Sequence, residues 1–248
     1  RGTPLSAAKV VYEGKATDLA VSAYHDPTPG FERDFVSVAT DFFHSKLFQR
    51  RGDQLVRVDV PDDAQADPHR QWLLIQLRSP WTVGGQSYPS GALLATNFDA
   101  FMAGQRQFTV LFRPDAHTAL SSYAWTKNHL ILDVLDDVKS RLEILTPQAG
   151  DWARAPLEGA PAMSTISVVD TDPDASDEYW LSVTGFLTPS TLQRGVAAEA
   201  KRFDVVGTLN RPDASGRRGN DESQRGEGKP GGGHEDLDFR PEIVYILQ

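Results

Sequence analysis

The sequence predicts an all-β protein, a β-propeller fragment of about four four-stranded blades followed by a disordered C-terminal tail. Three observations lead to this prediction. Short runs of alternating apolar and polar residues are separated by Gly, Pro and Asp, as antiparallel strands are. Glycine-centred turns recur at intervals of 45 to 52 residues. The composition also changes sharply after residue 206.

The expected strands are rich in Val, Ile, Leu and aromatic residues, which favour extended backbone. In chain order they span 19–26, 34–43, 54–60, 72–77, 108–112, 129–135, 141–145 and 179–186. Segment 81–94 contains Gly-Gly and Pro-Ser-Gly, a pattern typical of a hairpin with a turn at each end. Helical periodicity is scarce.

The repeat is marked by four glycines, each interpreted as the centre of a tight turn. They are Gly52, Gly104, Gly150 and Gly195, at steps of 52, 46 and 45 residues. A period of about 40–50 residues with about four strands per unit is typical of propeller blades, because each small sheet buries its two apolar faces by stacking on its neighbours. A pair of immunoglobulin-like sandwiches also gives closely spaced turn signals, so it remains the competing fold. The longer repeat favours the propeller.

The composition excludes several classes of protein. The chain has 248 residues, and 40% of them are hydrophobic, which is enough for a sizeable core. A net charge of −9 argues against nucleic-acid binding, because neutralising phosphates needs a surplus of Lys and Arg. No apolar run is long enough to span a membrane. The absence of cysteine excludes disulfides, thiolate metal sites and a cysteine nucleophile.

The two parts of the chain differ in what they can form. Residues 1–206 are expected to form the partial propeller domain, and 207–248 a Gly- and charge-rich tail with few large apolar residues. The final residues, Glu-Ile-Val-Tyr-Ile-Leu-Gln, could add a short strand. Because the chain begins at Arg1 and not at Met, we expect its true start to be missing. Cytoplasm and periplasm both fit.

Several long runs resemble one family. Segments 23–36, 72–104, 120–145 and 168–195 look like the β-propeller half of bacterial prolyl oligopeptidase-type serine peptidases, and the resemblance covers about residues 8 to 206. It implies a seven-bladed propeller that caps an α/β-hydrolase domain with a Ser-Asp-His triad. That domain cleaves short peptides, typically after proline, and the propeller filters their access. This chain would supply about four of the later blades.

The resemblance stops at residues 212–216, Pro-Asp-Ala-Ser-Gly, which are similar to the family's linker into the hydrolase domain. The Gly- and charge-rich tail then replaces the expected continuation. A truncated or frame-shifted coding sequence would produce this arrangement. The hydrolase domain would therefore be a missing partner, and the uncovered faces of the terminal blades could self-associate.

No residue of this sequence is assigned a catalytic, cofactor-binding or metal-binding role. A hydrolase nucleophile needs the motif Gly-x-Ser-x-Gly, and the nearest stretch, around Ser87, lacks the second glycine and a following helix. No two histidines have metal-site spacing. The six are His25, His44, His69, His117, His129 and His234, of which His25 and His129 lie at expected strand ends beside polar residues.

Acidic residues offer two further candidate sites, both weaker than a structural interpretation. Asp133, Asp136 and Asp137 could serve a glycoside hydrolase, but the alternation breaks at Asp136-Asp137, and acids of a turn are the better explanation. The acids within 170–178 (Asp170, Asp172, Asp174, Asp177 and Glu178) lack the glycine and the bidentate glutamate of a calcium loop. We interpret them as a solvated loop before a strand.

Arginine and tryptophan side chains are also assigned to structure. Arg33 is expected in a structural ion pair, and inter-blade packing is expected for the five tryptophans, Trp72, Trp81, Trp125, Trp152 and Trp180. The sequence therefore predicts a non-catalytic, substrate-gating propeller of a prolyl oligopeptidase-like serine peptidase, inactive alone. The alternatives are a stand-alone propeller scaffold for protein interactions and a glycan-acting propeller enzyme.

Overall fold

The structure is a computed structural model that describes residues 4, 7–137, 139–157, 164–185, 189–197 and, for the backbone alone, 203–208. Residues Val10–Asn210 form one compact unit, which is described by itself here. A second unit combines Arg1–Lys9 with Arg211–Gln248 and lies almost wholly outside the described residues. The predicted disorder of the tail falls there, although the last described strand extends to Thr208, beyond the expected boundary at residue 206.

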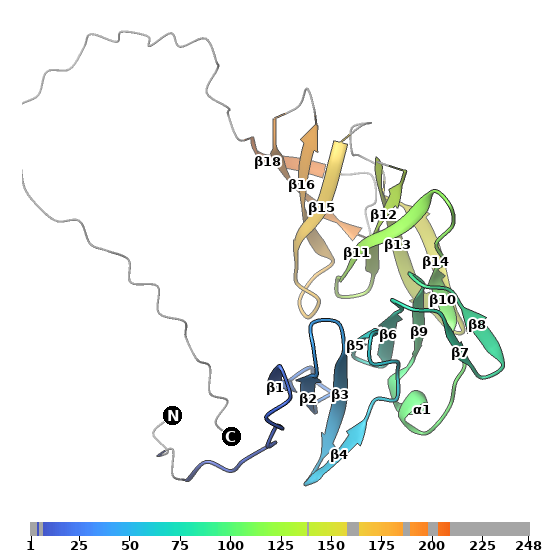
Figure 1. The fold of residues 1–248 in the computed structure, drawn as a ribbon. Coiled ribbons are helices and arrows are strands. Elements are labelled where there is room, and N and C mark those ends of the chain that lie inside the picture. Colours follow the sequence, from blue (N-terminus) through green and yellow to red (C-terminus); the bar gives the residue numbers. More distant parts are fainter. Residues whose placement is uncertain are drawn as a thin grey trace, which may run out of the picture. The chain divides into compact units, whose positions relative to one another are not determined.

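Four antiparallel four-stranded sheets follow one another along the chain (Figure 1). The first sheet contains β1 (Ala20–Asp26), β2 (Arg33–Ala39), β3 (Ser45–Arg51) and β4 (Gln54–Arg57). The second contains β5 (Gln65–His69), β6 (Trp72–Gln76), β9 (Leu93–Asn97) and β10 (Thr109–Phe112). The hairpin β7 (Trp81–Val83) and β8 (Gln86–Tyr88) and the short helix α1 (Phe98–Met102) are inserted into the second sheet's sequence.

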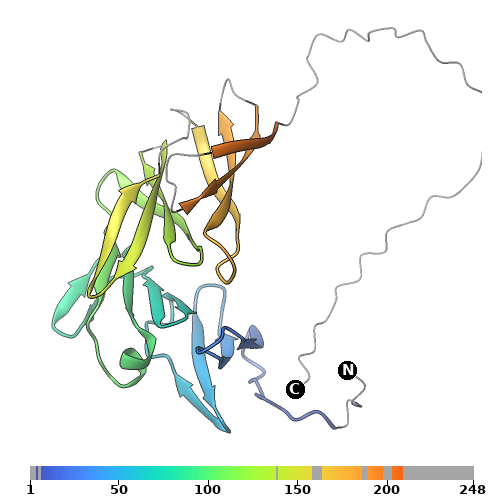
Figure 2. The same ribbon diagram turned by 180° about the vertical axis from the view of Figure 1, so that it is seen from behind.

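In the described parts of the third and fourth sheets there is no such insertion. The third contains β11 (Thr118–Trp125), β12 (Leu130–Asp136), β13 (Lys139–Gln148) and β14 (Asp151–Pro156). The fourth contains β15 (Ser164–Thr171), β16 (Glu178–Gly185), β17 (Thr191–Val196) and β18 (Phe203–Thr208). Figure 2 shows the same succession of sheets from behind. The predicted all-β propeller fragment of about four blades is confirmed.

Strand β6 shows why the sheets stack. Its residues Leu73 and Ile75 pack toward the first sheet, whereas Leu74 between them packs toward the third. Since neighbouring side chains of a strand point to opposite faces, a strand that is apolar at every position is buried on both sides. All three residues are fully buried, with 0% of their surface exposed, so β6 belongs to the middle of a stack.

Three apolar clusters join the four sheets in chain order. The first joins sheets one and two and includes Phe35 and Phe98, whose rings meet edge to face at 5.8 Å. The second joins sheets two and three and contains Trp125 and Trp152. The third joins sheets three and four and is centred on Tyr179 and Ile131. Each sheet therefore packs a face against each of its sequence neighbours, as expected for propeller blades.

The prediction that each repeating glycine is the centre of a tight turn is confirmed at three positions and wrong at one. Gly52 and Gly150 have positive φ in the turns between the third and fourth strands of their sheets, and Gly104 has φ 97° between α1 and β10. Gly195 instead lies within β17, opposite Tyr179 in β16. Its missing side chain makes room for the Tyr179 ring, because an added Cβ would lie 2.4 Å from the ring's Cζ atom.

Two predicted strands end earlier than expected. The strand predicted over 34–43 ends at Ala39, because residues 40–44 form a turn closed by Asp41. The strand predicted over 54–60 ends at Arg57, although Val58 and Val60 remain buried in the first cluster. In the part of the chain that the structure describes, no helix is both long and apolar enough to cross a membrane.

Candidate functional site

The turns between first and second strands are joined across the sheets by two arginines. Arg70, in the turn between β5 and β6, donates hydrogen bonds to the carbonyl oxygen of Lys127 at 2.6 Å and to that of Pro173 at 2.7 Å. Its own carbonyl oxygen accepts from Arg33 at 2.5 Å. Arg33 also pairs with Asp99 at 3.3 Å, so its predicted structural ion pair is confirmed. One network therefore links all four sheets at this end.

Asp177 completes this network. Its carboxylate accepts hydrogen bonds from the Thr126 hydroxyl at 2.9 Å, from the Asn128 backbone at 2.7 Å and from the Asn128 side chain at 2.8 Å. Burial raises the pKa of Asp177, but the hydrogen bonds from Asn128 and Thr126 outweigh this and hold it below its ordinary value. The interpretation of this acid as part of a solvated loop is therefore wrong, because its side chain is only 15% exposed.

The neighbouring acids have local structural roles. Asp172 accepts from the backbone amides of Asp174 and Ala175, which closes the turn. Glu178 pairs with Arg194 on the adjacent strand β17. Among the described residues, no group of three or more His, Asp or Glu side chains is arranged to hold a metal ion.

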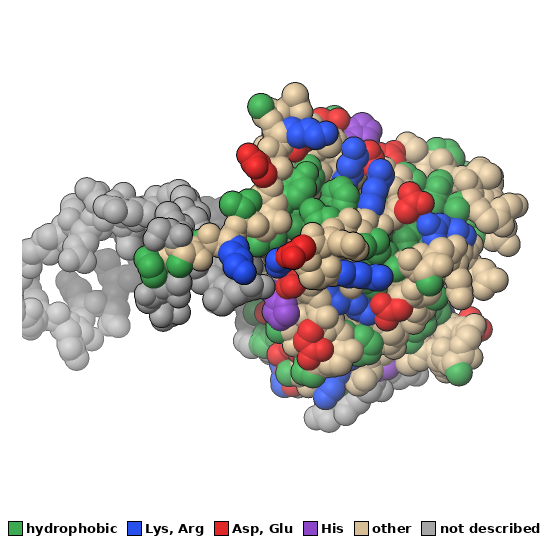
Figure 3. All heavy atoms as spheres, turned by 90° about the horizontal axis from the view of Figure 1, so that it is seen from below, with side chains coloured by type: hydrophobic (Ala, Val, Ile, Leu, Met, Phe, Trp, Pro, Cys, Tyr) green, Lys and Arg blue, Asp and Glu red, His purple; other side chains and the backbone are tan. Residues whose placement is uncertain are grey.

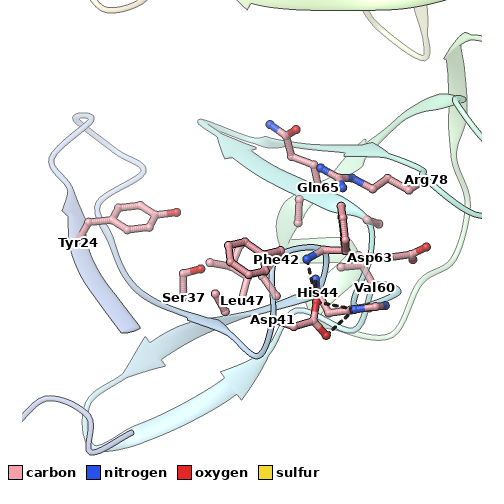
Figure 4. Close-up of a pocket in the computed structure, with 15 residues that line it drawn as sticks. Tyr24, Ser37, Asp41, Phe42, His44, Leu47, Val60, Asp63, Gln65 and Arg78 are labelled. Carbon is pink, nitrogen blue, oxygen red and sulfur yellow. Dashed lines mark hydrogen bonds and ion pairs between the residues drawn. The ribbon is translucent and has the colours of Figure 1, made fainter. Parts of the chain in front are cut away.

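A pocket of 320 Å³ opens between the first and second sheets (Figure 4). Tyr24 on β1 and Ser37 on β2 line one side, and Gln65 on β5 and Arg78 after β6 line the other. Leu47, Val60, Ala64 and Ala66 supply apolar walls. Sequence reasoning did not single out this pocket, because its residues come from four separate segments.

The turn between β2 and β3 forms the rim of this pocket. Asp41 accepts from the backbone amide of Phe43 at 2.8 Å and contacts the Nδ1 atom of His44 at 2.8 Å. The Phe43 amide first, and then the His44 side chain, lower the pKa of Asp41. This arrangement exposes the adjacent rings of Phe42 and Phe43, which are 84% and 68% accessible. Among described residues, no serine hydroxyl is hydrogen-bonded to His44, although Ser37 and Ser45 line the same pocket.

A second set of titratable side chains lies on the first strands of three neighbouring sheets. Burial raises the pKa of Asp67 on β5 to about 6, although the nearby Tyr123 hydroxyl lowers it. Burial, and then Asp67 itself, raise the pKa of Tyr24 on β1 to about 12. The pKa of Tyr123 on β11 is raised by burial and by Asp67. The group is thus a carboxyl and two protonated phenols in apolar surroundings.

The histidines have separate local partners. His25 contacts Asp34 at 2.8 Å, His117 contacts Asp137 at 3.0 Å, and His129 contacts the Thr146 hydroxyl at 2.8 Å. His69 stacks on Trp125 at 4.6 Å, and burial, followed by Arg70, lowers its pKa to about 4. His234 lies outside the described residues.

The remaining predicted positions are structural. Ser87 lies in the β7–β8 hairpin, where its hydroxyl is 2.6 Å from that of Thr82. Asp137 has φ 52° in the turn after β12, as predicted, and Asp136 ends that strand. Asp133 lies within β12, in the strand predicted over 129–135. It is 3% exposed, and burial raises its pKa.

Three of the five tryptophans, Trp72, Trp125 and Trp152, pack between the second and third sheets, as predicted. Trp152 lies 4.9 Å from Trp72 and 5.8 Å from Trp125, measured between ring centroids. Trp81 packs on Phe108 at 5.4 Å, and Trp180 is half-buried in β16. On the face seen in Figure 3, basic and acidic side chains are interspersed.

Comparison with known proteins shows which fold this arrangement of sheets represents. No family model matches the chain. An uncharacterized peptidase of Sinorhizobium fredii is 29% identical over 226 residues, which are 87% of this chain and 31% of that protein. The post-proline cleaving enzyme from Rickettsia typhi superposes on 86% of this chain and 32% of that one, with a TM-score of 0.74 and 19% identity. The fold is that of a prolyl oligopeptidase propeller.

Prolyl oligopeptidase B from Galerina marginata also matches, with a TM-score of 0.56 and 15% identity over 84% of this chain and 29% of that one. The chain therefore spans about three tenths of the length of the proteins it resembles. The resemblance inferred from the sequence is confirmed for the fold. In this propeller fragment, the Arg70 network lies at the turns between first and second strands, and the pocket lies beside the turn between second and third strands.

Proposed function

We propose that this chain is the non-catalytic, substrate-gating propeller part of a prolyl oligopeptidase-like serine peptidase that cleaves short peptides. The observation that carries the proposal is the match of four consecutive blades, over 86% of the chain, to a post-proline cleaving enzyme. The catalytic domain would be an α/β-hydrolase domain that this chain does not supply. Its substrates would be short peptides.

The chemistry of the residues supports a non-catalytic role. The sequence contains no Gly-x-Ser-x-Gly motif, which positions the serine nucleophile of an α/β-hydrolase. Within the described residues, the three histidines that contact an aspartate through Nδ1 are His25, His44 and His117, and no serine hydroxyl completes a triad with any of them.

The inter-blade contacts support a gating role. A propeller limits access by size only if its blades keep their spacing, and here the hydrogen bonds that Arg70 donates and Asp177 accepts reinforce three apolar interfaces. Charged groups that hydrogen-bond backbone carbonyls contribute more than neutral pairs do, so the network resists separation of the blades.

The first experiment tests for catalysis. The purified chain is incubated with a prolyl-anilide and with a fluorophosphonate probe, and the Rickettsia typhi enzyme serves as the active control. We expect neither hydrolysis nor labelling. A labelled serine identified by mass spectrometry would overturn the non-catalytic assignment.

The second experiment tests gating. Residues 10–208 replace the matching blades of the Rickettsia typhi enzyme, with and without Arg70→Ala. We expect the first chimera to cleave a short proline-containing peptide much faster than the same sequence within a folded protein. The Arg70→Ala chimera should lose part of this size selection. Equal size selection in both chimeras would contradict the role of the network in gating.

An interaction scaffold is the second candidate function. The observation that favours it is the exposed pair Phe42 and Phe43, because adjacent exposed aromatic rings often mark a binding surface. Cleavage of peptides by the chimera, together with unchanged activity after Phe42→Ser and Phe43→Ser, would favour the gating domain over the scaffold.

A further inference from the structure

The pocket between the first and second sheets contains an unpaired cation. Arg78 is exposed and forms no ion pair with a described residue, whereas Arg33, Arg106 and Arg154 each pair with an acid. Its guanidinium lies 6.0 Å from the centre of the Phe43 ring. Figure 4 shows the side chain extending along one edge of the pocket toward Gln65. A guanidinium held in this way presents paired donors that match a carboxylate.

Apolar surface surrounds this cation. Phe42 and Phe43 line the pocket with most of their surface exposed, and Leu47 and Val60 add apolar lining. Exposed apolar residues that occur singly are common, but two adjacent rings beside a pocket indicate a contact surface. A ligand that fits would therefore carry an apolar group next to an anionic one.

The other charges of the pocket restrict how such a ligand binds. The Asp41 carboxylate is already engaged by His44 and two backbone amides. Asp63 also lines the pocket and has no ion-pair partner among the described residues, so it repels an anion on its side. The anionic group of a ligand is thus directed to the side lined by Arg78 and Gln65.

We propose that this pocket binds the C-terminal end of a short peptide, with the terminal carboxylate on Arg78 and the last, apolar side chain against Phe42 and Phe43. The pocket volume of 320 Å³ lies at the small end of the range of about 300–1,000 Å³ typical of ligand pockets, so it accommodates one or two residues. The choice of a peptide as the ligand rests on the proposed function. The carboxylate and the apolar side chain of the ligand follow from the residues that line the pocket.

Fluorescence anisotropy tests the proposal on the full chain. The probe is a tetrapeptide ending in Pro-Phe, labelled at its N-terminus, prepared as the free acid and as the C-terminal amide. We expect the amide to bind about tenfold more weakly, because it loses the charge-assisted hydrogen bonds. Arg78→Gln should weaken binding of the acid by about the same factor and remove the difference between acid and amide.

Matched variants separate this site from general effects. Arg113→Gln removes another exposed arginine of the second sheet and should leave affinity unchanged. Phe42→Ser with Phe43→Ser should weaken both probes, and Asp63→Asn should strengthen binding of the acid. Near-UV circular dichroism confirms that each variant is folded. Equal affinity for acid and amide, or equal losses for Arg78→Gln and Arg113→Gln, would overturn the proposal.

The failure of this proposal is distinguishable from failure of the gating function. Direct binding of N-acetylphenylalanine, measured by isothermal titration calorimetry and abolished by Arg78→Gln, without binding of the tetrapeptide would overturn the peptide ligand while retaining a carboxylate site. Loss of size selection in the chimera, by contrast, leaves peptide binding by the isolated chain unaffected. Peptide binding by the isolated chain and size selection in the chimera therefore test the two proposals separately.

Discussion

The Arg70 guanidinium of the second sheet donates a hydrogen bond to the Pro173 carbonyl oxygen of the fourth, 103 residues further along the chain. The same side chain reaches Lys127 of the third sheet. A single residue with a left-handed backbone, at φ 49°, thus contacts two other blades. This relationship leads to the first prediction.

Replacing Arg70 by alanine should lower the free energy of unfolding by about 2 kcal/mol, because two charge-assisted hydrogen bonds are lost. Arg70→Gly should lower the free energy of unfolding by about 1 kcal/mol less than the alanine variant does, since glycine adopts positive φ without strain. Urea unfolding followed by tryptophan fluorescence measures both values. If neither variant shifts the urea midpoint, the inter-blade hydrogen bonds add nothing to stability.

Asp177 should be far more sensitive to substitution than the acid three residues before it. Asp177→Ala leaves the Asn128 amide and the Thr126 hydroxyl without their acceptor, which we expect to cost about 1–3 kcal/mol. Asp174 is exposed in the same turn, so Asp174→Ala is the matched control and should change stability by less than about 0.5 kcal/mol. Equal effects of the two variants would argue that the loop is uniformly solvated.

Gly195 should tolerate no side chain. An added Cβ would lie 2.3 Å from the Tyr179 hydroxyl oxygen, so Gly195→Ala should destabilise the chain by about 1–3 kcal/mol through overpacking. Tyr179→Ala removes the obstacle, and the double variant should lose less than the sum of the two single variants. Strict additivity, measured by thermal or urea unfolding, would contradict a direct contact.

Asp67 and His69 should give opposite pH dependences of stability. The folded-state pKa of Asp67, about 6, is above its ordinary value of 3.8, so the folded state binds more protons and stability falls as the pH rises from about 4 to 6. The pKa of His69, about 4, is below its ordinary 6.5, so stability rises between about pH 4 and 6.5. In the parent chain the two trends largely cancel.

Substituting either residue should reveal the trend of the other. Asp67→Asn should leave a rise in the free energy of unfolding between pH 4 and 6.5, of at most about 3 kcal/mol. His69→Phe, which keeps a ring on Trp125, should leave a fall between pH 4 and 6. Urea titrations at several pH values measure these slopes. Parallel slopes in the two variants would show that the pKa shifts have other sources.

The strands could be predicted because the pattern of apolar and polar residues along a strand follows from which of its side chains are buried. The run at 72–77 is apolar at consecutive positions, and β6 is indeed buried on both faces. The strand predicted over 129–135 contains Asp133, but the alternation did not indicate that this carboxylate is buried. The pairing of β12 with both of its neighbours encloses it.

The site residues could not be predicted in the same way, because they depend on contacts between distant segments. Nothing near residue 70 indicates that its side chain reaches Pro173, and nothing near residue 177 indicates its acceptor role toward Thr126. Gly195 fits the sequence repeat by coincidence of spacing. Its function depends on Tyr179, which only the strand register places opposite it.

The Arg70 network has a consequence for how the chain acquires its structure during synthesis. The carbonyl oxygen of Arg70 binds a group made earlier, on Arg33, whereas its guanidinium must wait for acceptors made 57 and 103 residues later. The second blade can therefore assemble its own strands before its arginine has a partner. Its final stiffness is acquired only when the fourth blade leaves the ribosome.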